Sequence, residues 1–284
     1  MPFDGLRVLS LETRKGADIE KLIARQGGIP TVAASVRERP LDRHAAIDRL
    51  LDGLDRNEFD MVVCMTGVGL AFLRDVVAAQ GALDRLVDGL RRVTIVSRGP
   101  KPVAVLRALE IPIHILIPEP NTWREIVAAV APRSERRIAV QEYGRPNLEM
   151  NAALENLGAT VTPVAIYRWE LPQDTAPLRA AARALAANRF DVALFTSSIQ
   201  LDHLMLIAAE EGIEPQVRDA LAKHAVIASI GPVMNDALSA HGFTPDIVPD
   251  HPKMGNLVKT AAERAVQAVE AKRGAARPAP IPQE

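Results

Sequence analysis

The stretch Phe59-Asp60-Met61-Val62-Val63 decides the fold, because it returns later in the chain as Phe190-Asp191-Val192-Ala193-Leu194. The two stretches lie 131 residues apart, and the same offset places Arg7-Val8-Leu9 on Ile138-Ala139-Val140. The pair Gly99-Pro100 also returns, 132 residues later, as Gly231-Pro232, and in both places a serine stands two residues before the glycine. Three blocks in nearly one register predict two copies of one structural unit. The repeat by itself allows a simple division near residue 132.

Each copy is predicted to alternate strands with helices. Apolar runs indicate five strands in the first copy, at 6–11, 30–36, 58–65, 93–96 and 113–117. The second copy indicates five more, at 137–141, 160–167, 192–196, 225–229 and 246–248. Helices are expected between them, among them 18–26, 147–157 and 233–241. This alternation predicts parallel sheets in a doubly wound α/β fold, whose ligands bind beyond the carboxyl ends of the strands.

Composition excludes several classes of protein. The 284 residues carry 34 Lys and Arg against 35 Asp and Glu, so no global basic field favours nucleic acid or a membrane surface. Cys64, the single cysteine, excludes an intrachain disulfide framework and a cysteine-based zinc site, and the six histidines lack metal-ligand spacing. The N-terminus lacks a signal-peptide pattern. We therefore expect a soluble, cytoplasmic protein without a metal.

Small polar residues and glycines follow the predicted strands. An arginine stands just before the first helix of each copy, where helix N–H groups and a guanidinium together can bind a carboxylate or phosphate. Hydroxyl and glycine residues follow the third strands and suit an anion cradle, but helix capping explains them equally well. The Gly-Pro pairs indicate tight turns into helices. These segments are Arg14, Arg145, Thr66-Gly67, Thr196-Ser197-Ser198, Gly99-Pro100 and Gly231-Pro232.

Reactive motifs are sparse. The chain has no nucleophile elbow, Walker loop or zinc-protease motif. Two tyrosines, Tyr143 and Tyr167, lie at predicted strand ends of the second copy. An enzyme of this kind would act mainly by holding its substrate in a reactive shape.

Over about residues 6–262 the chain resembles uroporphyrinogen-III synthases. The residues that carry the resemblance are Ser10–Arg14, Gly27-Gly28, Pro40-Leu41, Asp60–Gly69, Ala165–Arg168, Phe195–Ser198, Ser229–Pro232, Gly242, Pro245-Asp246 and His251–Met254. The resemblance implies two similar doubly wound parallel-sheet lobes joined by a two-stranded linker, with the active site in the cleft between them. The implied parts are a first lobe at 1–37 plus 171–265, a second at 41–166, a linker at 38–40 and 167–170, and a flexible tail at 271–284.

The resemblance also implies an activity. The family converts hydroxymethylbilane to uroporphyrinogen III in heme and tetrapyrrole biosynthesis, as a hydro-lyase that cyclises a linear tetrapyrrole and inverts its terminal ring. It uses no metal or organic cofactor. A monomer is expected, with hydroxymethylbilane synthase as the transient partner that hands over the substrate.

The site residues implied by the resemblance are one candidate acid and a set of binding residues. Tyr167 would protonate the departing hydroxyl. The substrate carboxylates would be held by Arg14, Thr66, Gly67, Ser97, Gly99, Gly144, Asn147, Ser197, Ser198, Gly231 and Lys253. Pro102 and Met234 stand where the family commonly has threonine. This departure leaves open a non-catalytic relative that binds a tetrapyrrole or another polyanion. A solute receptor or a DNA-binding regulator is disfavoured.

Overall fold

The chain folds into two compact units. The computed structural model describes residues 2–41 and 45–275. One unit holds the chain up to Arg37 together with the chain from Leu171 onward, and the other holds Glu38–Glu170. The chain therefore passes between the units twice. Strands β3 (Arg37–Pro40) and β9 (Tyr167–Glu170), which adjoin these two crossings, pair with each other as a two-stranded sheet.

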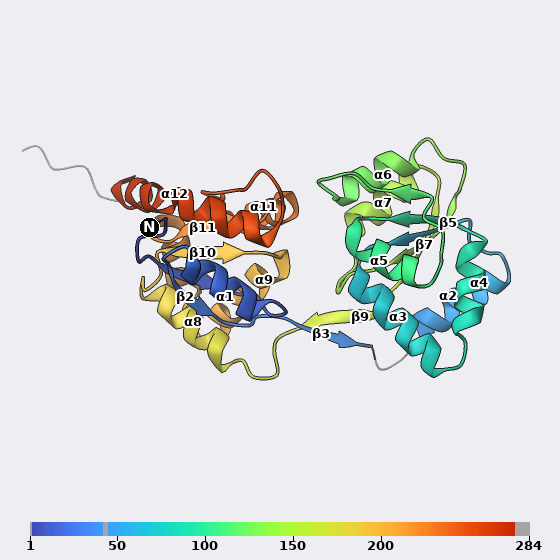
Figure 1. The fold of residues 1–284 in the computed structure, drawn as a ribbon, viewed down its shortest axis with the longest axis horizontal. Coiled ribbons are helices and arrows are strands. Elements are labelled where there is room, and N and C mark those ends of the chain that lie inside the picture. The colour runs from blue at the N-terminus through green and yellow to red at the C-terminus, as the bar shows by residue number, and fades with distance from the viewer. Residues whose placement is uncertain (1, 42–44, 276–284) are drawn as a thin grey trace, which may run out of the picture. The chain divides into compact units, whose positions relative to one another are not determined.

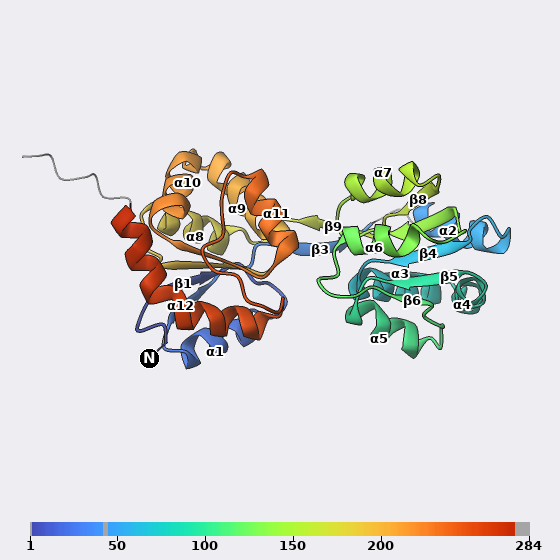
Figure 2. The same cartoon turned by 90° about the horizontal axis from the view of Figure 1, so that it is seen from above.

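The first unit is built on a four-stranded parallel sheet in the order β11-β10-β1-β2. Its strands are β1 (Arg7–Ser10), β2 (Ile29–Val32), β10 (Val192–Phe195) and β11 (Val226–Ser229). One face packs on α1 (Gly16–Arg25) and α12 (Met254–Ala275). The other face packs on α8 (Ala176–Ala186), α9 (Ser198–Glu210), α10 (Glu214–Lys223) and α11 (Pro232–Ala240). Figure 1 labels most of these strands and helices, and Figure 2 shows the sheet between the two helical layers.

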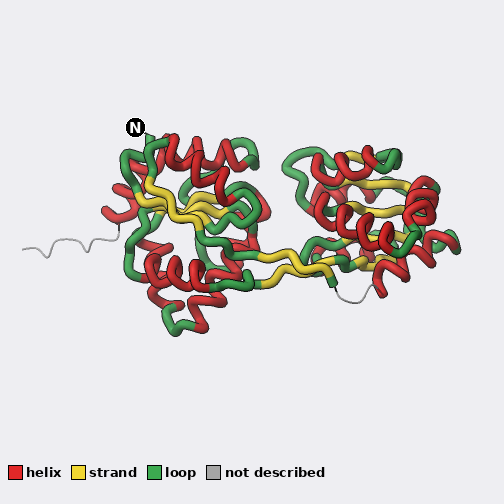
Figure 3. The backbone as a smooth tube through the Cα atoms, turned by 60° about the horizontal axis from the view of Figure 1, so that its bottom comes forward, coloured by secondary structure: helices red, strands yellow, loops and turns green. Residues whose placement is uncertain are grey.

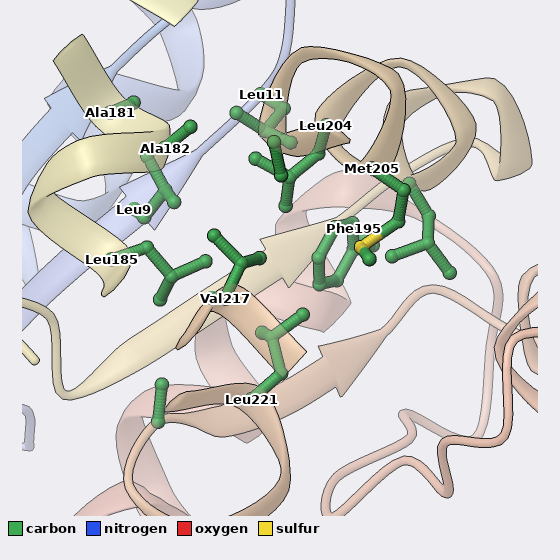
Figure 4. Packing of buried hydrophobic residues seen from close by; sticks show 14 of the residues in the cluster. Leu9, Leu11, Ala181, Ala182, Leu185, Phe195, Leu204, Met205, Val217 and Leu221 are labelled. Atoms are coloured by element: carbon green, nitrogen blue, oxygen red, sulfur yellow. The ribbon is translucent and has the colours of Figure 1, made fainter. Parts of the chain in front are cut away.

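Alternation along the strands explains this layered core. Side chains on a strand point to opposite faces in turn, so Val8 packs toward α1 and α12 while Leu9 packs toward α8. Phe195, which is fully buried, lies on the α9 face near Leu204 and Met205 (Figure 4). Strands that are apolar on both faces are typical of a parallel sheet covered by helices.

The second unit has a five-stranded parallel sheet in the order β6-β5-β4-β7-β8. Its strands are β4 (Met61–Cys64), β5 (Thr94–Ser97), β6 (Ile115–Leu116), β7 (Arg137–Gln141) and β8 (Thr160–Val164). One face packs on α2 (Ala45–Asp55), α3 (Gly67–Ala79), α4 (Leu83–Arg91) and α5 (Pro100–Ala108). The other packs on α6 (Trp123–Val130) and α7 (Leu148–Asn156). The α/β fold with parallel sheets predicted from sequence is confirmed, and Figure 3 traces both sheets.

Neither sheet comes from one copy of the sequence repeat. The first sheet joins β1 and β2 of the first copy to β10 and β11 of the second. The second sheet joins β4, β5 and β6 of the first copy to β7 and β8 of the second. The division near residue 132 that the repeat allows is therefore wrong. Each unit combines the opening of one copy with the remainder of the other.

An aspartate–arginine pair closes the amino end of each central strand. Asp191, just before β10, accepts hydrogen bonds from the Arg7 backbone N–H at 2.8 Å and from Arg7 Nε at 3.0 Å. Asp60, just before β4, accepts from the Arg137 backbone N–H and from Nε, both at 3.1 Å. Burial raises the pKa of Asp191, but the bonds from Arg7 and Arg273 outweigh it and lower that pKa to about 2. The repeated Phe-Asp pair therefore encodes the same aspartate–arginine ion pair in both units.

Several predicted boundaries need correction. The strand predicted at 30–36 ends at Val32. At 246–248 only Ile247 forms a bridge, to Ala228, so no full strand forms there. The strand predicted at 160–167 ends at Val164, because Tyr167 opens β9 and pairs outside the main sheet. Helix α12 continues through 271–275, the first part of the predicted tail.

Ion pairs give the physical reason for this last difference. Lys272 Nζ lies 2.6 Å from an Asp246 oxygen, and an Arg273 guanidinium nitrogen lies 2.7 Å from an Asp191 oxygen. These contacts fasten the last turn of α12 to the first unit. The rest of the predicted tail, 276–284, lies outside the described residues. Within the part of the chain that the structure describes, no helix is long and apolar enough to span a membrane.

Candidate functional site

The predicted site residues gather at the carboxyl ends of the two parallel sheets. Those of the first unit are Arg14, Ser197, Ser198, Gly231 and Lys253. Those of the second unit are Thr66, Gly67, Ser97, Gly99, Gly144, Asn147 and Tyr167. Within the second unit, β4 lies between β5 and β7, with Cys64 beside Ser97 and Gln141, so the residues that follow these strands share one edge. This edge is called the second-unit edge below.

A hydroxyl pair lies at the second-unit edge. Thr66 caps α3, and its Oγ1 accepts a hydrogen bond from the Gly69 backbone N–H at 3.0 Å. The same oxygen lies 3.3 Å from the Tyr167 hydroxyl, and either group can donate. The Thr66 backbone N–H donates to Gln141 Oε1 at 3.0 Å. Strand β4 and helix α3 thus hold the threonine hydroxyl against the tyrosine at the start of β9.

Tyr167 is a core residue that offers only its hydroxyl to chemistry. The residue is 4% exposed, and its ring packs edge-on against Phe72 with the ring centroids 5.8 Å apart. Thr66 is partly exposed. Because the phenol ring is enclosed, its position is fixed by packing. A proton can pass only through the hydroxyl end that meets Thr66.

Close packing explains why Gly67 and Gly144 are glycines. A Cβ at Gly67 would stand 2.6 Å from the Lys101 carbonyl oxygen, where α3 and α5 meet. Gly144 has φ +67°, and a Cβ there would clash with the Trp169 ring. Both positions therefore exclude larger residues through backbone geometry and contact. Their glycines follow from packing whether or not a ligand binds nearby.

An aromatic and cationic group continues the same edge. The Arg98 guanidinium carbon lies 5.1 Å from the centroid of the Tyr143 ring, a cation–π geometry. Tyr143 also packs edge-on against Trp169, with centroids 5.7 Å apart. Asn147 Nδ2 donates to the Tyr143 hydroxyl at 3.1 Å, and its Oδ1 caps α7 by accepting from the Met150 N–H at 3.0 Å. Tyr143 is thereby held on three sides.

Ser97 and Gly99 build a turn. Ser97 is fully buried, and its hydroxyl donates to the Gly99 carbonyl at 3.0 Å. Gly99 caps α5 ahead of Pro100, and a Cβ on Gly99 would stand 2.6 Å from Asn121 Oδ1. The Ser97 hydroxyl is therefore engaged in shaping this turn, and its role in binding substrate stays a prediction. Between these two residues, Arg98 presents a longer and charged side chain.

Two polar residues at the second-unit edge were missed as candidates. Glu142 is 7% exposed, its Oε1 has no hydrogen-bond partner among the described residues, and burial raises its pKa. Arg98 stands inside a Ser-Arg-Gly-Pro segment that indicates a turn more strongly than a site. The available signal for Arg98 is the comparison of copies, since the second copy has Ile230 at that position.

At the carboxyl end of the first sheet, polar side chains of the first unit hydrogen-bond to one another, and Asn235 Oδ1, in the first turn of α11, is buried without a partner among the described residues. Thr196 Oγ1 donates to Glu12 Oε2 at 2.5 Å, and Gln200 Oε1 accepts from the Thr196 N–H at 2.8 Å. Arg14 and Lys253 are exposed there, whereas Ser198 and Gly231 are buried. Exposed cations could approach a polyanion, but buried Ser198 and Gly231 shape the backbone.

The two positions that depart from the resembled family lie in the interior. Met234 is 1% exposed and belongs to the core between α11 and α9. Pro102 is buried in α5. Neither position presents a side chain at the surface, so a missing hydroxyl there removes no exposed group from the site.

Cysteine and metal chemistry find little support among the described side chains. Burial raises the pKa of the Cys64 thiol to about 12, so it stays protonated at neutral pH. In the described chain, no three His, Cys, Asp or Glu side chains gather where they could hold a metal ion.

Comparisons with known proteins identify relatives over most of the length. The family model described as "Uroporphyrinogen-III synthase HemD" matches residues 17–259. "Uncharacterized protein YjjA" of Bacillus subtilis (strain 168) is 27% identical over 266 residues, which cover 91% of this chain and 96% of that protein. A "Putative uroporphyrinogen-III synthase" of Methanothermobacter thermautotrophicus (strain Delta H) is 33% identical over 91 residues, 32% of this chain and 35% of that protein.

Solved structures agree in fold. A mutant uroporphyrinogen III synthase from the extremely thermophilic bacterium Thermus thermophilus superposes with a TM-score of 0.71 at 22% identity, covering 93% of this chain and 99% of that one. Uroporphyrinogen-III synthetase from Helicobacter pylori 26695 superposes with a TM-score of 0.54 at 9% identity, covering 90% and 98%. At these identities the likeness concerns the fold.

Proposed function

We propose that the chain, which belongs to the uroporphyrinogen-III synthase family, converts hydroxymethylbilane to uroporphyrinogen III. The observation that carries the proposal is the family match over residues 17–259. The hydroxyl pair of Thr66 and Tyr167 at the carboxyl edge of a parallel sheet supports it, because ligands of such sheets bind at that edge.

The reaction is a cyclisation with loss of water. The hydroxyl of the hydroxymethyl group leaves with one added proton as water, while the methylene carbon stays on the first ring. The last ring then attacks that methylene carbon through its own substituted carbon. The resulting spiro intermediate breaks one carbon–carbon bond and recloses with the last ring inverted. The carbon of the last ring that forms the new bond on reclosure releases its proton, which balances the proton taken up by the departing hydroxyl. Nothing is oxidised or reduced. Because the substrate also loses its hydroxyl unaided and closes to the uninverted isomer, the enzyme must chiefly control geometry.

In this proposal Tyr167 supplies the proton to the departing hydroxyl. A phenol is a weak acid, which suits donation to a hydroxyl that departs readily. Thr66 Oγ1, at 3.3 Å, orients the phenol hydroxyl and can return a proton to it. Since water departs from the substrate readily, we expect loss of Tyr167 to slow the reaction without abolishing it.

Substrate binding is the second part of the proposal. Hydroxymethylbilane carries eight carboxylates, which the near-neutral chain must hold with local cations and backbone N–H groups. The exposed Arg14 and Lys253 and the helix starts at Thr66-Gly67 and Ser197-Ser198 suit this task. We further propose that the protein works as a monomer in the cytoplasm, without a cofactor, on substrate handed over by hydroxymethylbilane synthase.

The isomer of the product tests the proposal. Hydroxymethylbilane is generated from porphobilinogen by hydroxymethylbilane synthase, the protein is added at several concentrations, and the oxidised porphyrins are separated by chromatography. We expect isomer III in excess, in a share that grows with protein concentration. Isomer I alone, at the rate of a protein-free control, would refute the synthase and favour a non-catalytic tetrapyrrole binder.

A further inference from the structure

Arg98 is distinguished from the other partly buried arginines by its lack of a polar partner. Within residues 2–41 and 45–275, every other partly buried arginine places its guanidinium in an ion pair or a hydrogen bond, as Arg7 does with Asp191 and Arg39 with Glu170. Arg98 has neither among the described residues, and its guanidinium instead stacks on the Tyr143 ring at 5.1 Å. A partly buried cation without an anion is costly, and a stacked ring offsets only part of that cost.

The surroundings of Arg98 are aromatic. Burial lowers the pKa of the Arg98 guanidinium, while Tyr143 and Tyr167 raise it. No described carboxylate acts on it to a comparable degree. Burial outweighs the contributions of the two tyrosines and lowers the pKa overall, but an arginine stays protonated at neutral pH, and its guanidinium has donors to spare beside the Tyr143 ring. Guanidinium donors form a planar fork that matches a carboxylate through two parallel hydrogen bonds.

Hydrogen bonds and packing hold the backbone at Arg98, so the position of its Cα atom is fixed. The Arg98 N–H donates to the Cys64 carbonyl at 3.1 Å, which ties it to the end of β4. The next residue, Gly99, is held by the Ser97 hydroxyl and packs against Asn121. The guanidinium then lies over the Tyr143 ring, which is itself held by Asn147 and Trp169.

The first unit shows that the fold does not need this arginine. Ile230 occupies the equivalent position, and its N–H donates to the Phe195 carbonyl at 3.0 Å, the counterpart of the bond from Arg98 to Cys64. The Ile230 side chain packs against the core instead of holding a charge. The same turn thus accepts an apolar residue, so the charge at Arg98 requires a reason other than folding.

We propose that Arg98, stacked on Tyr143 at the second-unit edge, binds one carboxylate of the tetrapyrrole substrate through its guanidinium. The inference rests on the proposed function for the identity of the ligand. It assigns to one named side chain a task that the glycines of the turn, which have no side chains, cannot perform. It also places a bound carboxylate on the same sheet edge as the Thr66–Tyr167 pair, since Arg98 follows β5, Thr66 follows the neighbouring β4, and the Arg98 N–H donates to the Cys64 carbonyl at the end of β4.

Direct binding of uroporphyrin III tests the inference without turnover. This stable porphyrin carries eight carboxylates, and its dissociation constant is measured by tryptophan quenching at low and high salt. We expect Arg98→Met, which keeps an apolar stem of similar length, to raise the dissociation constant about 10-fold at low salt. Arg98→Lys, which keeps the charge without the planar fork, should raise it about 3-fold. The loss should shrink as salt rises.

A matched control removes the same charge elsewhere in the segment. Arg107 is exposed near the end of α5, and Arg107→Met should leave the dissociation constant within about 2-fold of the wild-type value, because an exposed charge away from the edge contributes little. Competition by inorganic phosphate and by citrate distinguishes a general anion site, which both would block at millimolar concentration, from one that needs the porphyrin. Unfolding curves check that Arg98→Met is folded. If it is not, the dissociation constant of Arg98→Lys is compared with that of the wild type instead.

The outcomes separate this inference from the proposed function. Equal dissociation constants for wild-type protein and Arg98→Met, or no binding by the wild type, would overturn the role of Arg98 even if isomer III is formed. A loss confined to Arg98 variants would support it even if the protein forms only isomer I. If inorganic phosphate by itself displaces the bound porphyrin, the site binds small anions in general, and the assignment of Arg98 to a substrate carboxylate would be overturned.

Discussion

The two units agree at the amino ends of their sheets and differ at the carboxyl ends. At the amino ends, Asp60 pairs with Arg137 as Asp191 pairs with Arg7, down to the same backbone and Nε bonds. At the carboxyl ends, Arg98 of the second unit corresponds to Ile230 of the first. The aspartate–arginine pairs that both units share therefore stabilise the fold, whereas Arg98, which only the second unit has, is available for function.

The carboxyl ends also differ in how their polar groups are used. In the first unit Glu12 and Gln200 satisfy Thr196 from within the unit, although one oxygen of Asn235, in the first turn of α11, is buried without a partner among the described residues. In the second unit Arg98 and one oxygen of Glu142 are left without polar partners among the described residues. Unsatisfied polar groups are expensive inside a protein and gather where a ligand or a reaction requires them. The amino ends therefore stabilise the fold. The second-unit edge differs from the first unit in that a cation and a carboxylate oxygen lack polar partners in the part of the chain that the structure describes, so chemistry is expected chiefly there.

The amino-end pairs can be broken one at a time, and their unequal burial predicts unequal costs. The Asp191 side chain is 7% exposed and receives both Arg7 and Arg273, whereas that of Asp60 is 30% exposed. We expect Asp191→Asn to lower the free energy of unfolding by about 3 kcal/mol and Asp60→Asn by about 1 kcal/mol. Urea unfolding at pH 7 measures both free energies. A larger loss in Asp60→Asn than in Asp191→Asn would contradict the link between burial and cost.

Acid should act on the same pair in a defined direction. The pKa of Asp191 is about 2 in the folded protein against an ordinary 3.8, so the pair stabilises the fold above pH 3.8. That contribution, about 2 kcal/mol, is lost as the pH falls through 2. The difference between wild-type protein and Asp191→Asn should therefore narrow at acid pH, while a constant difference would mean that packing, not charge, carries it.

Met234 tests whether a hydroxyl is missing from the carboxyl end of the first unit. Because Met234 lies in the core, Met234→Thr should leave a cavity, bury a hydroxyl and cost about 2 kcal/mol in the free energy of unfolding. It should not raise the rate of isomer III formation. A gain in turnover at saturating substrate would show that the side chain at 234 meets the substrate after all.

Glu142 gives the smallest expected effect and the opposite sign. Its raised pKa means that ionisation opposes folding, so wild-type protein loses stability as the pH rises above the ordinary glutamate value. Glu142→Gln should therefore be more stable than wild type by about 1 kcal/mol at pH 8 and equal to it near pH 4. Thermal unfolding measures the difference. Glu149→Gln, an exposed change in α7, should show no gain; the same gain there would point to net charge instead of burial.

Much of the fold could be predicted because the repeat is encoded in residues that make the sheets. Phe59-Asp60 and Phe190-Asp191 mark the central strands since the aspartates need arginine partners and the following residues are buried on both faces. The exchange of strands between copies could not be read from the repeat, because either pairing satisfies the same apolar pattern. Only contacts far apart in sequence decide between them.

The candidate site could be predicted less well, for reasons visible at single residues. The resemblance to the family makes Ser97 a candidate for binding, but in the fold its hydroxyl is buried and turned toward Gly99. Arg98, beside it, cannot be separated from a solvated turn residue until its lack of a polar partner is known. The sequence pattern indicates where a residue lies along a strand or a turn, whereas its function depends on which groups the end of its side chain contacts.

The most direct test of the central claim compares two hydroxyl deletions at opposite ends of the second sheet. Tyr167→Phe removes the hydroxyl at the carboxyl edge, and Thr94→Val removes the one that donates to Glu135 at the amino end. The rate of isomer III formation at saturating hydroxymethylbilane should fall about 10-fold in Tyr167→Phe and stay within about 2-fold in Thr94→Val. Equal rates in wild-type protein and Tyr167→Phe would contradict a catalytic role for the second-unit edge.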